Sequence, residues 1–234
     1  MDSTADENAA LYRLLAWLSP SYPIGAFSYS HGLETAIEQG FVTDAETLSV
    51  WITDIVEQGS GRNDGLILRA AYGAAIANDQ DALIEIADLA AAFQHTSELL
   101  LETTNQGRAF LETTTAAWPT ATLKKLEQVR QGRPAPLAAV VGVAAAGHDI
   151  SLSATLHGYL HAFVANLVSA GVRLVPLGQT DGQRIIAALE PAIAKIASDV
   201  LTLDKPLNHL ASNTIVNDWC SMRHETQYTR LFRS

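Results

Sequence analysis

Residues 43–56, Thr-Asp-Ala-Glu-Thr-Leu-Ser-Val-Trp-Ile-Thr-Asp-Ile-Val, carry the pattern that sets the fold class. Apolar side chains recur through this stretch at Leu48, Trp51, Ile52, Ile55 and Val56. Side chains three and four positions apart share one face of an α-helix, so this spacing predicts a helix with one buried stripe. Thr43 followed by Glu46 predicts a capping box at the start of that helix.

The same spacing covers most of the chain. It returns at Leu11, Leu14, Leu15 and Leu18, at Leu160, Phe163, Val164 and Leu167, and at Ile185, Leu189, Ile193, Ile196 and Val200. Glycine and proline separate these stretches, as expected for connections between helices. Residues 172–177 are the one possible strand, and a single strand has nothing to pair with. We therefore predict an all-α protein, a single-domain helical bundle of roughly eight to ten helices.

Length, charge and cysteine content exclude several classes of protein. A chain of 234 residues can bury a core without disulfides or metals. Its formal net charge of −10 argues against nucleic-acid binding, which depends on clustered Lys and Arg. The acidic N-terminus and the lack of an 18-residue apolar run predict neither a signal peptide nor a membrane span. Cys220 is the only cysteine, which favours a cytoplasmic protein.

The C-terminal segment, residues 221–234, has the most distinctive chemistry. Arginine and aromatic residues dominate interface hot spots, and they gather here in an otherwise acidic chain. The segment contains Arg223, Tyr228, Arg230, Leu231, Phe232 and Arg233, with His224 and Glu225 beside them. We predict an all-helical domain over residues 1–220 and a partner-docking tail over residues 221–234. A segment that folds back onto its own core is the alternative.

Motifs for catalysis are missing or incomplete. The chain has no Gly-x-x-x-x-Gly-Lys-Ser/Thr loop for nucleotide phosphates. Residues 28–32, Ser-Tyr-Ser-His-Gly, approach the Gly-x-Ser-x-Gly elbow of hydrolases. However, Ser28 replaces the first glycine, and no strand precedes the motif. We therefore expect a protein that is not an enzyme and needs no cofactor.

His157 and His161 are the candidates for a metal site. Their i, i+4 spacing places both imidazoles on one helical face, and imidazole suits Ni(II), Zn(II) and Cu(II). Two ligands do not close a site, and no cysteine or carboxylate nearby in sequence completes it. An ordinary pair of surface or interface histidines is the preferred interpretation, so no metal site is predicted.

Two loops leave their role open. Residues 19–34 carry Tyr22, Phe27 and Tyr29 on a connector rich in proline and glycine, where they either enter the core or form a contact surface. Gln179, Thr180 and Asp181 form a polar stretch that either caps a helix or contacts a partner.

Three segments together resemble the family of urease accessory proteins called UreF. They are residues 19–34, with Pro-Ile-Gly-Ala-Phe-Ser-Tyr-Ser-His-Gly at 23–32; residues 169–184, with Leu-Gly-Gln-Thr-Asp-Gly at 177–182; and residues 221–234, ending in Arg-Leu-Phe-Arg-Ser. All three occur in the order typical of the family. The middle of the chain, roughly residues 80–150, carries no motif that adds to the resemblance.

The resemblance implies an all-helical, cytoplasmic homodimer without enzymatic activity. Such proteins bind UreD, also called UreH, and recruit the GTPase UreG, so that nickel reaches apo-urease through the accessory complex. Their C-terminal tail becomes ordered on binding UreD, and an arginine before Leu-Phe-x-Ser is implicated in UreG recruitment, a role that would fall to Arg230. Two alternatives stay open: a direct nickel carrier using His157 and His161, or an effector of the GTPase acting through Arg230 or Arg233.

Overall fold

The computed structural model describes residues 3–234, and side chains from Asp6 onward. This part of the chain contains eleven α-helices, two short 3-10 helices and no strand. The α-helices are α1 (Ser3–Trp17), α2 (Leu33–Glu38), α3 (Ala45–Gln58), α4 (Ser60–Ala77), α5 (Gln80–Ala92), α6 (Ser97–Ala117), α7 (Ala121–Arg130), α8 (Leu137–Gly147), α9 (Leu152–Leu174), α10 (Gln179–Thr202) and α11 (Ile215–His224). The 3-10 helices are η1 (Ala26–Ser28) and η2 (Pro206–His209). The all-α prediction is confirmed. Only Gly59 separates α3 from α4, so the two form nearly one continuous element.

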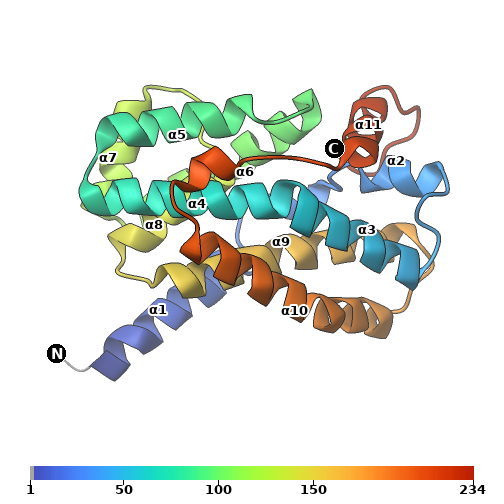
Figure 1. Ribbon diagram of the computed structural model, residues 1–234, viewed down its shortest axis with the longest axis horizontal. Coiled ribbons are helices and arrows are strands. Elements are labelled where there is room, and N and C mark those ends of the chain that lie inside the picture. The colour runs from blue at the N-terminus through green and yellow to red at the C-terminus, as the bar shows by residue number, and fades with distance from the viewer. Residues whose placement is uncertain (1–2) are drawn as a thin grey trace.

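Helix α8 forms the centre of the core. Residues 138–146 are buried all round, and α4, α6, α7 and α9 pack against this helix. Its alanines and Gly142 let α4 come very close, because a methyl group at Gly142 would lie 2.4 Å from the Leu68 carbonyl oxygen. In Figure 1, α3 and α4 run end to end across the molecule, with α10 along one side and α5 along the other. The α2–α11 pair lies at one end of the molecule, far from the projecting start of α1.

The predicted helix over residues 43–56 is present, but a different pair of residues caps it. The Thr47 amide donates to Asp44 Oδ1 at 2.9 Å, and the Asp44 amide donates to Thr47 Oγ1 at 3.1 Å. The predicted pair of Thr43 and Glu46 is therefore wrong by one position. A threonine hydroxyl can accept the returning hydrogen bond as a glutamate does, which lets the helix begin one residue later.

The apolar stripe predicted at the N-terminus is divided between two environments. Leu14 is 8% exposed and belongs to the core, whereas Leu11 and Leu15 are 55% and 66% exposed. The prediction of a single core-facing stripe is therefore only half right. Figure 1 shows the reason: the first part of α1 projects away from the body of the molecule.

The segment considered as a possible strand is the end of a helix. Helix α9 continues to Leu174, and Val175 then turns the chain toward α10. Among the described residues, no helix is both long enough and apolar enough to cross a bilayer.

Candidate partner-binding site at the C-terminal segment

The C-terminal segment packs against the body of the molecule in this structure. Helix α11 ends at His224, and the chain then returns so that Phe232 and Ser234 are buried. The Arg233 amide donates to the Ser28 carbonyl at 2.8 Å, and the Ser30 amide donates to the Ser234 carbonyl at 3.0 Å. The boundary expected after residue 220 thus falls inside α11, and residues 225–234 form the non-helical part of the segment.

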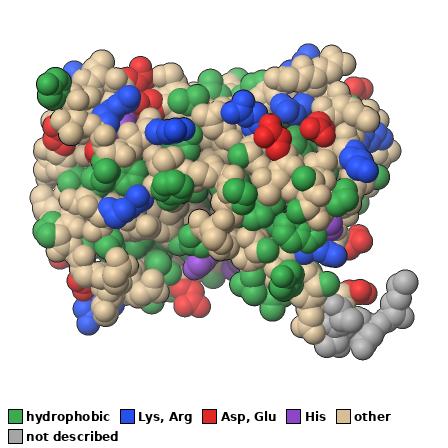
Figure 2. Space-filling view, turned by 180° about the vertical axis from the view of Figure 1, so that it is seen from behind, with side chains coloured by type: hydrophobic (Ala, Val, Ile, Leu, Met, Phe, Trp, Pro, Cys, Tyr) green, Lys and Arg blue, Asp and Glu red, His purple; other side chains and the backbone are tan. Residues whose placement is uncertain are grey.

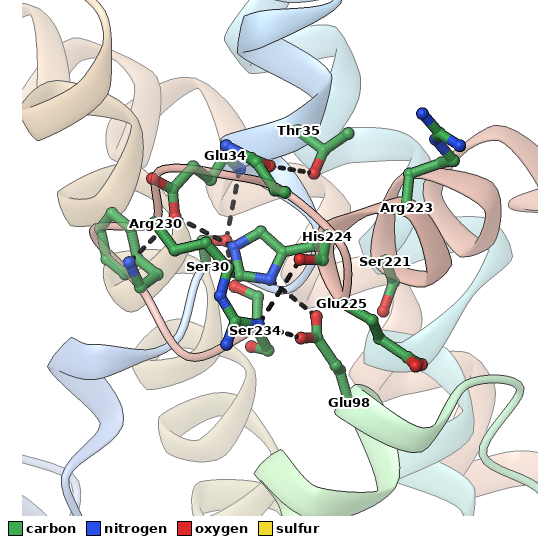
Figure 3. A network of polar contacts seen from close by, with 12 residues as sticks. Ser30, Glu34, Thr35, Glu98, Ser221, Arg223, His224, Glu225, Arg230 and Ser234 are labelled. Carbon is green, nitrogen blue, oxygen red and sulfur yellow. Dashed lines mark hydrogen bonds and ion pairs between the residues drawn. The ribbon is translucent and has the colours of Figure 1, made fainter.

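A buried histidine holds the segment between two glutamates (Figure 3). His224 has no exposed surface; its Nε2 lies 3.0 Å from Glu34 Oε2 and its Nδ1 lies 2.8 Å from Glu98 Oε2. Each ring nitrogen therefore has a carboxylate oxygen within hydrogen-bond distance. The ring joins α11 to both α2 and α6.

The two glutamates also bind the residues that follow. Glu34 accepts the amides of Leu231 at 2.7 Å and Phe232 at 2.9 Å. Glu98 accepts from Arg230 Nη1 at 2.9 Å. We call these four side chains, Glu34, Glu98, His224 and Arg230, the anchor network. The two glutamates share the His224 ring, and Glu98 also faces the Arg230 guanidinium, so each buried carboxyl group has hydrogen-bond partners.

Burial shifts the pKa of one glutamate of the anchor network. Desolvation raises the pKa of Glu98, although the neighbouring His224 and Arg230 oppose that rise. Arg230 is the least buried member, with 39% of its side chain exposed. Its guanidinium makes one short contact to Glu98 and a longer one, 3.5 Å, to the His224 carbonyl.

A second buried cluster lies one helical turn further along α6. Glu102 accepts from the Ser234 hydroxyl at 2.6 Å and lies 3.3 Å from His31 Nδ1. The other ring nitrogen of His31 is 2.9 Å from Ser60 Oγ. Burial lowers the pKa of His31, but the charge and hydrogen bond of Glu102 together with the charges of Asp64 and Asp218 outweigh this effect, so the net shift of the pKa is upward. The last residue of the described chain is thus bound to α6 and to the loop before α2.

His31, Ser60 and Glu102 line a pocket of about 190 Å³. Asp64 and the apolar Leu18 and Phe27 line it as well. Tyr159 donates its hydroxyl to Asp64 Oδ2 at 2.6 Å. Burial raises the pKa of Asp64 from 3.8 to about 6.

Asp64 predicts a pH-dependent change in stability. Folding raises the pKa of this carboxyl, so the ionised form is less favourable in the folded protein than in the unfolded chain. The carboxyl therefore destabilises the fold increasingly as the pH rises from about 4 to about 6. We compare the free energy of unfolding of Asp64→Asn with that of the wild type at each pH. Between pH 4.5 and pH 7.5 this difference should shift in favour of the variant by about 1–2 kcal/mol. Urea denaturation of wild type and variant at both pH values measures this difference. The exposed Asp54→Asn is the control, and a pH-independent effect of Asp64→Asn would contradict the prediction.

The aromatic side chains of the loop over residues 19–34 divide between the core and the surface. Tyr22 and Tyr29 are buried, and the Tyr22 hydroxyl is 2.8 Å from Thr114 Oγ1. Phe27 is exposed. The two tyrosines therefore pack in the core, and of these three aromatic side chains Phe27 is the one at the surface.

The remaining candidates lie outside the anchor network. Gln179 and Thr180 are exposed at the start of α10, where Asp181 accepts the Gly178 amide at 3.2 Å and so caps the helix. His157 and His161 are exposed on α9, and His157 Nδ1 lies 2.8 Å from the Ser153 carbonyl. Within the described part of the chain, no group of three or more His, Cys, Asp or Glu side chains is placed to hold a metal ion.

Sequence reasoning selected His224 and Arg230 but missed their partners. In the sequence, Glu34, Glu98 and Glu102 cannot be distinguished from exposed glutamates on a helix. Their only signal is that Glu98 and Glu102 are one turn apart beside the apolar Leu99, on the side of α6 that faces the core.

The fold and the site define a class of protein: a helical body with a C-terminal segment fixed by buried polar contacts. The profile of the UreF family matches residues 42–190. The chain is 50% identical, over 99% of its length and 95% of the relative, to a urease accessory protein UreF of Rhodopseudomonas palustris strain BisB18. It is 48% identical, over 100% of its length and 95% of the relative, to a urease accessory protein UreF of Bradyrhizobium diazoefficiens. The chain belongs to the UreF family.

Proposed function

We propose that this chain acts in urease maturation as a non-enzymatic, cytoplasmic adaptor. It binds UreD with its C-terminal segment and recruits the GTPase UreG, so that nickel reaches apo-urease through the complex. It works as a homodimer. The names of its relatives support a role as a urease accessory protein, and the two-sided C-terminal segment supports the role of an adaptor.

The observation that carries the proposal is that one side of this segment is buried in the body while the other side is exposed. Its inner side, His224, Phe232 and Ser234, is buried in the body. Its outer side exposes Tyr228 completely and Leu231 to 65%. Arg223 points away from the anchor network (Figure 3). The segment therefore presents hot-spot residue types on a backbone that is already fixed.

The exposed face of α11 extends this surface. Ile215, Val216, Trp219 and Met222 are all exposed there, and the Trp219 ring packs edge-on against Phe41 at 6.2 Å. A contiguous apolar surface of this kind on a soluble protein is typical of a docking site. Because the anchor network fixes the segment, less conformational entropy is lost when the partner binds. We therefore place UreD on the outer face of α11 and residues 225–233.

UreG recruitment is proposed for polar residues at two positions, Arg230 and the start of α10. Arg230 holds the turn between α11 and Leu231 through Glu98, while part of its guanidinium stays exposed. We assign it a positioning role in the loop and a contact role toward UreG. The exposed residues Gln179 and Thr180 at the start of α10 belong to the same proposal, and Asp181 keeps that helix start in place.

Replacing the outer side chains tests UreD docking without disturbing the core. We expect Tyr228→Ala combined with Leu231→Ala to weaken UreD binding by about 100-fold or more, because each removes an exposed anchor of the proposed interface. Isothermal titration calorimetry with purified UreD measures the effect. Truncation before Ser221 is a poorer test, because it cuts α11 and uncovers buried residues.

The matched control is Ile76→Ala, which removes an equally exposed apolar side chain from α4. It should bind UreD as the wild type does. Unchanged affinity of the Tyr228/Leu231 variant would move the UreD surface away from the C-terminal segment and remove the main support for the proposal.

A further inference from the structure

A shallow groove of about 380 Å³ runs along the exposed face of α6. One wall is α6 itself, from Ser97 to Arg108, and the other is the connection between α7 and α8, residues 130–135. The two walls meet where Ala135 lies in backbone contact with Gly107. We call this feature the arginine groove.

Arginine side chains line both walls of the groove. Arg108 comes from α6, whereas Arg130 and Arg133 come from the connection. Arg133 forms an ion pair with Asp88 at 2.6 Å, yet 53% of its side chain stays exposed. Within the described part of the chain, Arg108 and Arg130 form no ion pair. The chain therefore leaves most of this positive charge without a negative partner.

The charge of the groove differs from that of the rest of the surface. On the face shown in Figure 2, Lys and Arg side chains lie scattered among Asp and Glu side chains. Glu112 and Glu127 lie one helical turn from Arg108 and Arg130, and Glu225 contacts the hydroxyl of the first residue of α6. Among the described residues, none of these three glutamates is within ion-pair distance of the arginines. Guanidinium groups line the groove, and no described carboxylate does.

The connection holds its two arginines on a closed turn. The Arg133 amide donates to the Arg130 carbonyl at 2.8 Å, and Arg130 Nη1 donates to the Arg133 carbonyl at 2.9 Å. Gln131 and Gly132 between them have positive φ angles of 45° and 81°, and Pro134 follows with its φ fixed by the ring. A ligand that binds here therefore meets a backbone that is already ordered, which lowers the entropy lost on binding.

Apolar residues also line the groove. They include Leu101, which is 49% exposed, together with Pro134 and Ala135. From Ser97 to Arg108 the α6 wall is about 16 Å long, at about 1.5 Å per residue. An extended peptide covers that length with about five residues. We propose that the arginine groove binds an extended acidic segment of a partner protein, in which carboxylates flank one apolar side chain.

Charge and shape favour a protein segment over other anions. A guanidinium can hold a carboxylate through two parallel hydrogen bonds, so arginines on a fixed backbone suit Asp and Glu side chains. Nucleic acids depend on many phosphate contacts and would meet a chain with a net charge of −10. A free phosphate ion has no apolar part to cover Leu101.

The groove also lies next to the surface proposed for UreD. Glu225 of the C-terminal segment contacts Ser97, which lines the groove. A protein docked on the outer face of α11 can therefore place a neighbouring segment in the groove. The inference goes beyond the proposed function, because it concerns a second contact surface and does not depend on which protein supplies the segment.

A short peptide of the proposed chemistry tests the groove directly. The probe is a dye-labelled peptide of sequence Glu-Glu-Leu-Glu-Glu, titrated with the full chain and followed by fluorescence anisotropy. We expect a dissociation constant below about 1 mM at low salt. Binding should weaken by about 10-fold or more in about 1 M salt, where the Debye length is about 3 Å. In NMR spectra of the isotope-labelled full chain, the peptide should shift the amides of residues 97–108 and 130–135.

The substitution Arg108→Glu tests the role of the arginines. Arg108 is exposed, and glutamate is a good helix former, so the variant should fold, which circular dichroism checks. We expect the dissociation constant of the peptide to rise by about 10-fold or more. Lys124→Glu is the matched control, because it changes the net charge equally at an exposed position of α7 outside the groove. It should bind the peptide as the wild type does.

A second peptide, Glu-Glu-Ser-Glu-Glu, tests the apolar contact without altering the protein. It should bind at least about 3-fold more weakly, because serine cannot cover Leu101. Equal binding by the wild type and Arg108→Glu, equal losses in Arg108→Glu and Lys124→Glu, or amide shifts away from the groove would each overturn the proposal.

Two further results would replace the acidic segment with another ligand. If inorganic phosphate displaced the first peptide and both peptides bound equally, the groove would be a simple anion site. If a single-stranded oligonucleotide bound more tightly than the peptide, it would be a nucleic-acid site. None of these results affects UreD docking, which is measured separately with Tyr228 and Leu231.

Discussion

Replacing His224 with alanine is expected to destabilise the protein by about 3–5 kcal/mol. The substitution removes the imidazole ring that lies 3.0 Å from Glu34 Oε2 and 2.8 Å from Glu98 Oε2. Both carboxyl groups are nearly inaccessible to water, and losing the shared partner leaves two buried polar groups desolvated without their hydrogen bonds, which costs far more than at an exposed site. The loss of the packed ring in a site with no exposed surface adds to this cost.

The same substitution should release the C-terminal segment before the rest of the chain unfolds. Glu34 accepts the amides of Leu231 and Phe232, and it is held in place by His224. We expect these two amides to lose protection in hydrogen exchange by a factor on the order of 100. Amides in α8, at the centre of the core, exchange through global unfolding, so their protection should fall only as far as the free energy of unfolding of the whole protein falls.

Chemical denaturation and hydrogen exchange of His224→Ala measure both effects. His157→Ala is the control, because this histidine is exposed on α9, and its loss should change stability by less than about 0.5 kcal/mol. If His224→Ala denatured at the same urea concentration as the wild type, the anchor network would not be what holds the segment.

The anchor network shows where prediction from sequence ends. Arginine and aromatic residues at positions 221–234 are unusual enough to be noticed locally. Their partners are not, because Glu34 lies 190 residues from His224 in sequence and Glu98 lies 126 residues away. A carboxylate on a helix looks the same whether it faces solvent or a buried histidine. Only the packing of α2, α6 and α11 distinguishes the two.

The helices themselves were more accessible to prediction. Spacing at 3.6 residues identifies α3, α9 and α10 because each buries one continuous stripe. Helix α1 fails the same test because its first part projects away from the body (Figure 1), so its apolar spacing has no core to face there. The exposed Leu11 and Leu15 match the pattern of a core helix and lie outside the core.

Glycines in close contacts were also beyond the reach of local patterns. Gly107 and Gly73 both sit inside long helices, α6 and α4, and look equivalent in sequence. A methyl group at Gly73 would meet nothing within 4 Å. At Gly107 it would lie 1.7 Å from the Ala135 carbonyl oxygen and 2.7 Å from the Leu137 amide nitrogen. The segment that leads into α8 therefore crosses α6 in direct backbone contact.

The pair of substitutions Gly107→Ala and Gly73→Ala isolates that contact. Both changes bring the same intrinsic gain of about 0.5–1 kcal/mol, because alanine is the better helix former. Gly73→Ala should show this gain. Gly107→Ala should instead lose about 3 kcal/mol or more, because the obstruction is backbone and cannot rotate aside. Thermal and urea denaturation of the two variants measure the difference.

The effect of Gly107→Ala should extend to the C-terminal segment. Helix α6 carries both Glu98 and Glu102, which bind His224, Arg230 and Ser234. Displacing α6 from the segment before α8 shifts both carboxylates, so the amides of Leu231 and Phe232 should exchange faster in this variant, as in His224→Ala. A Gly107→Ala variant as stable as Gly73→Ala would show that the two backbones are not in contact in solution. If Gly107→Ala lost stability while the two amides stayed fully protected, the packing of α6 against the segment before α8 would not control how the C-terminal segment is held.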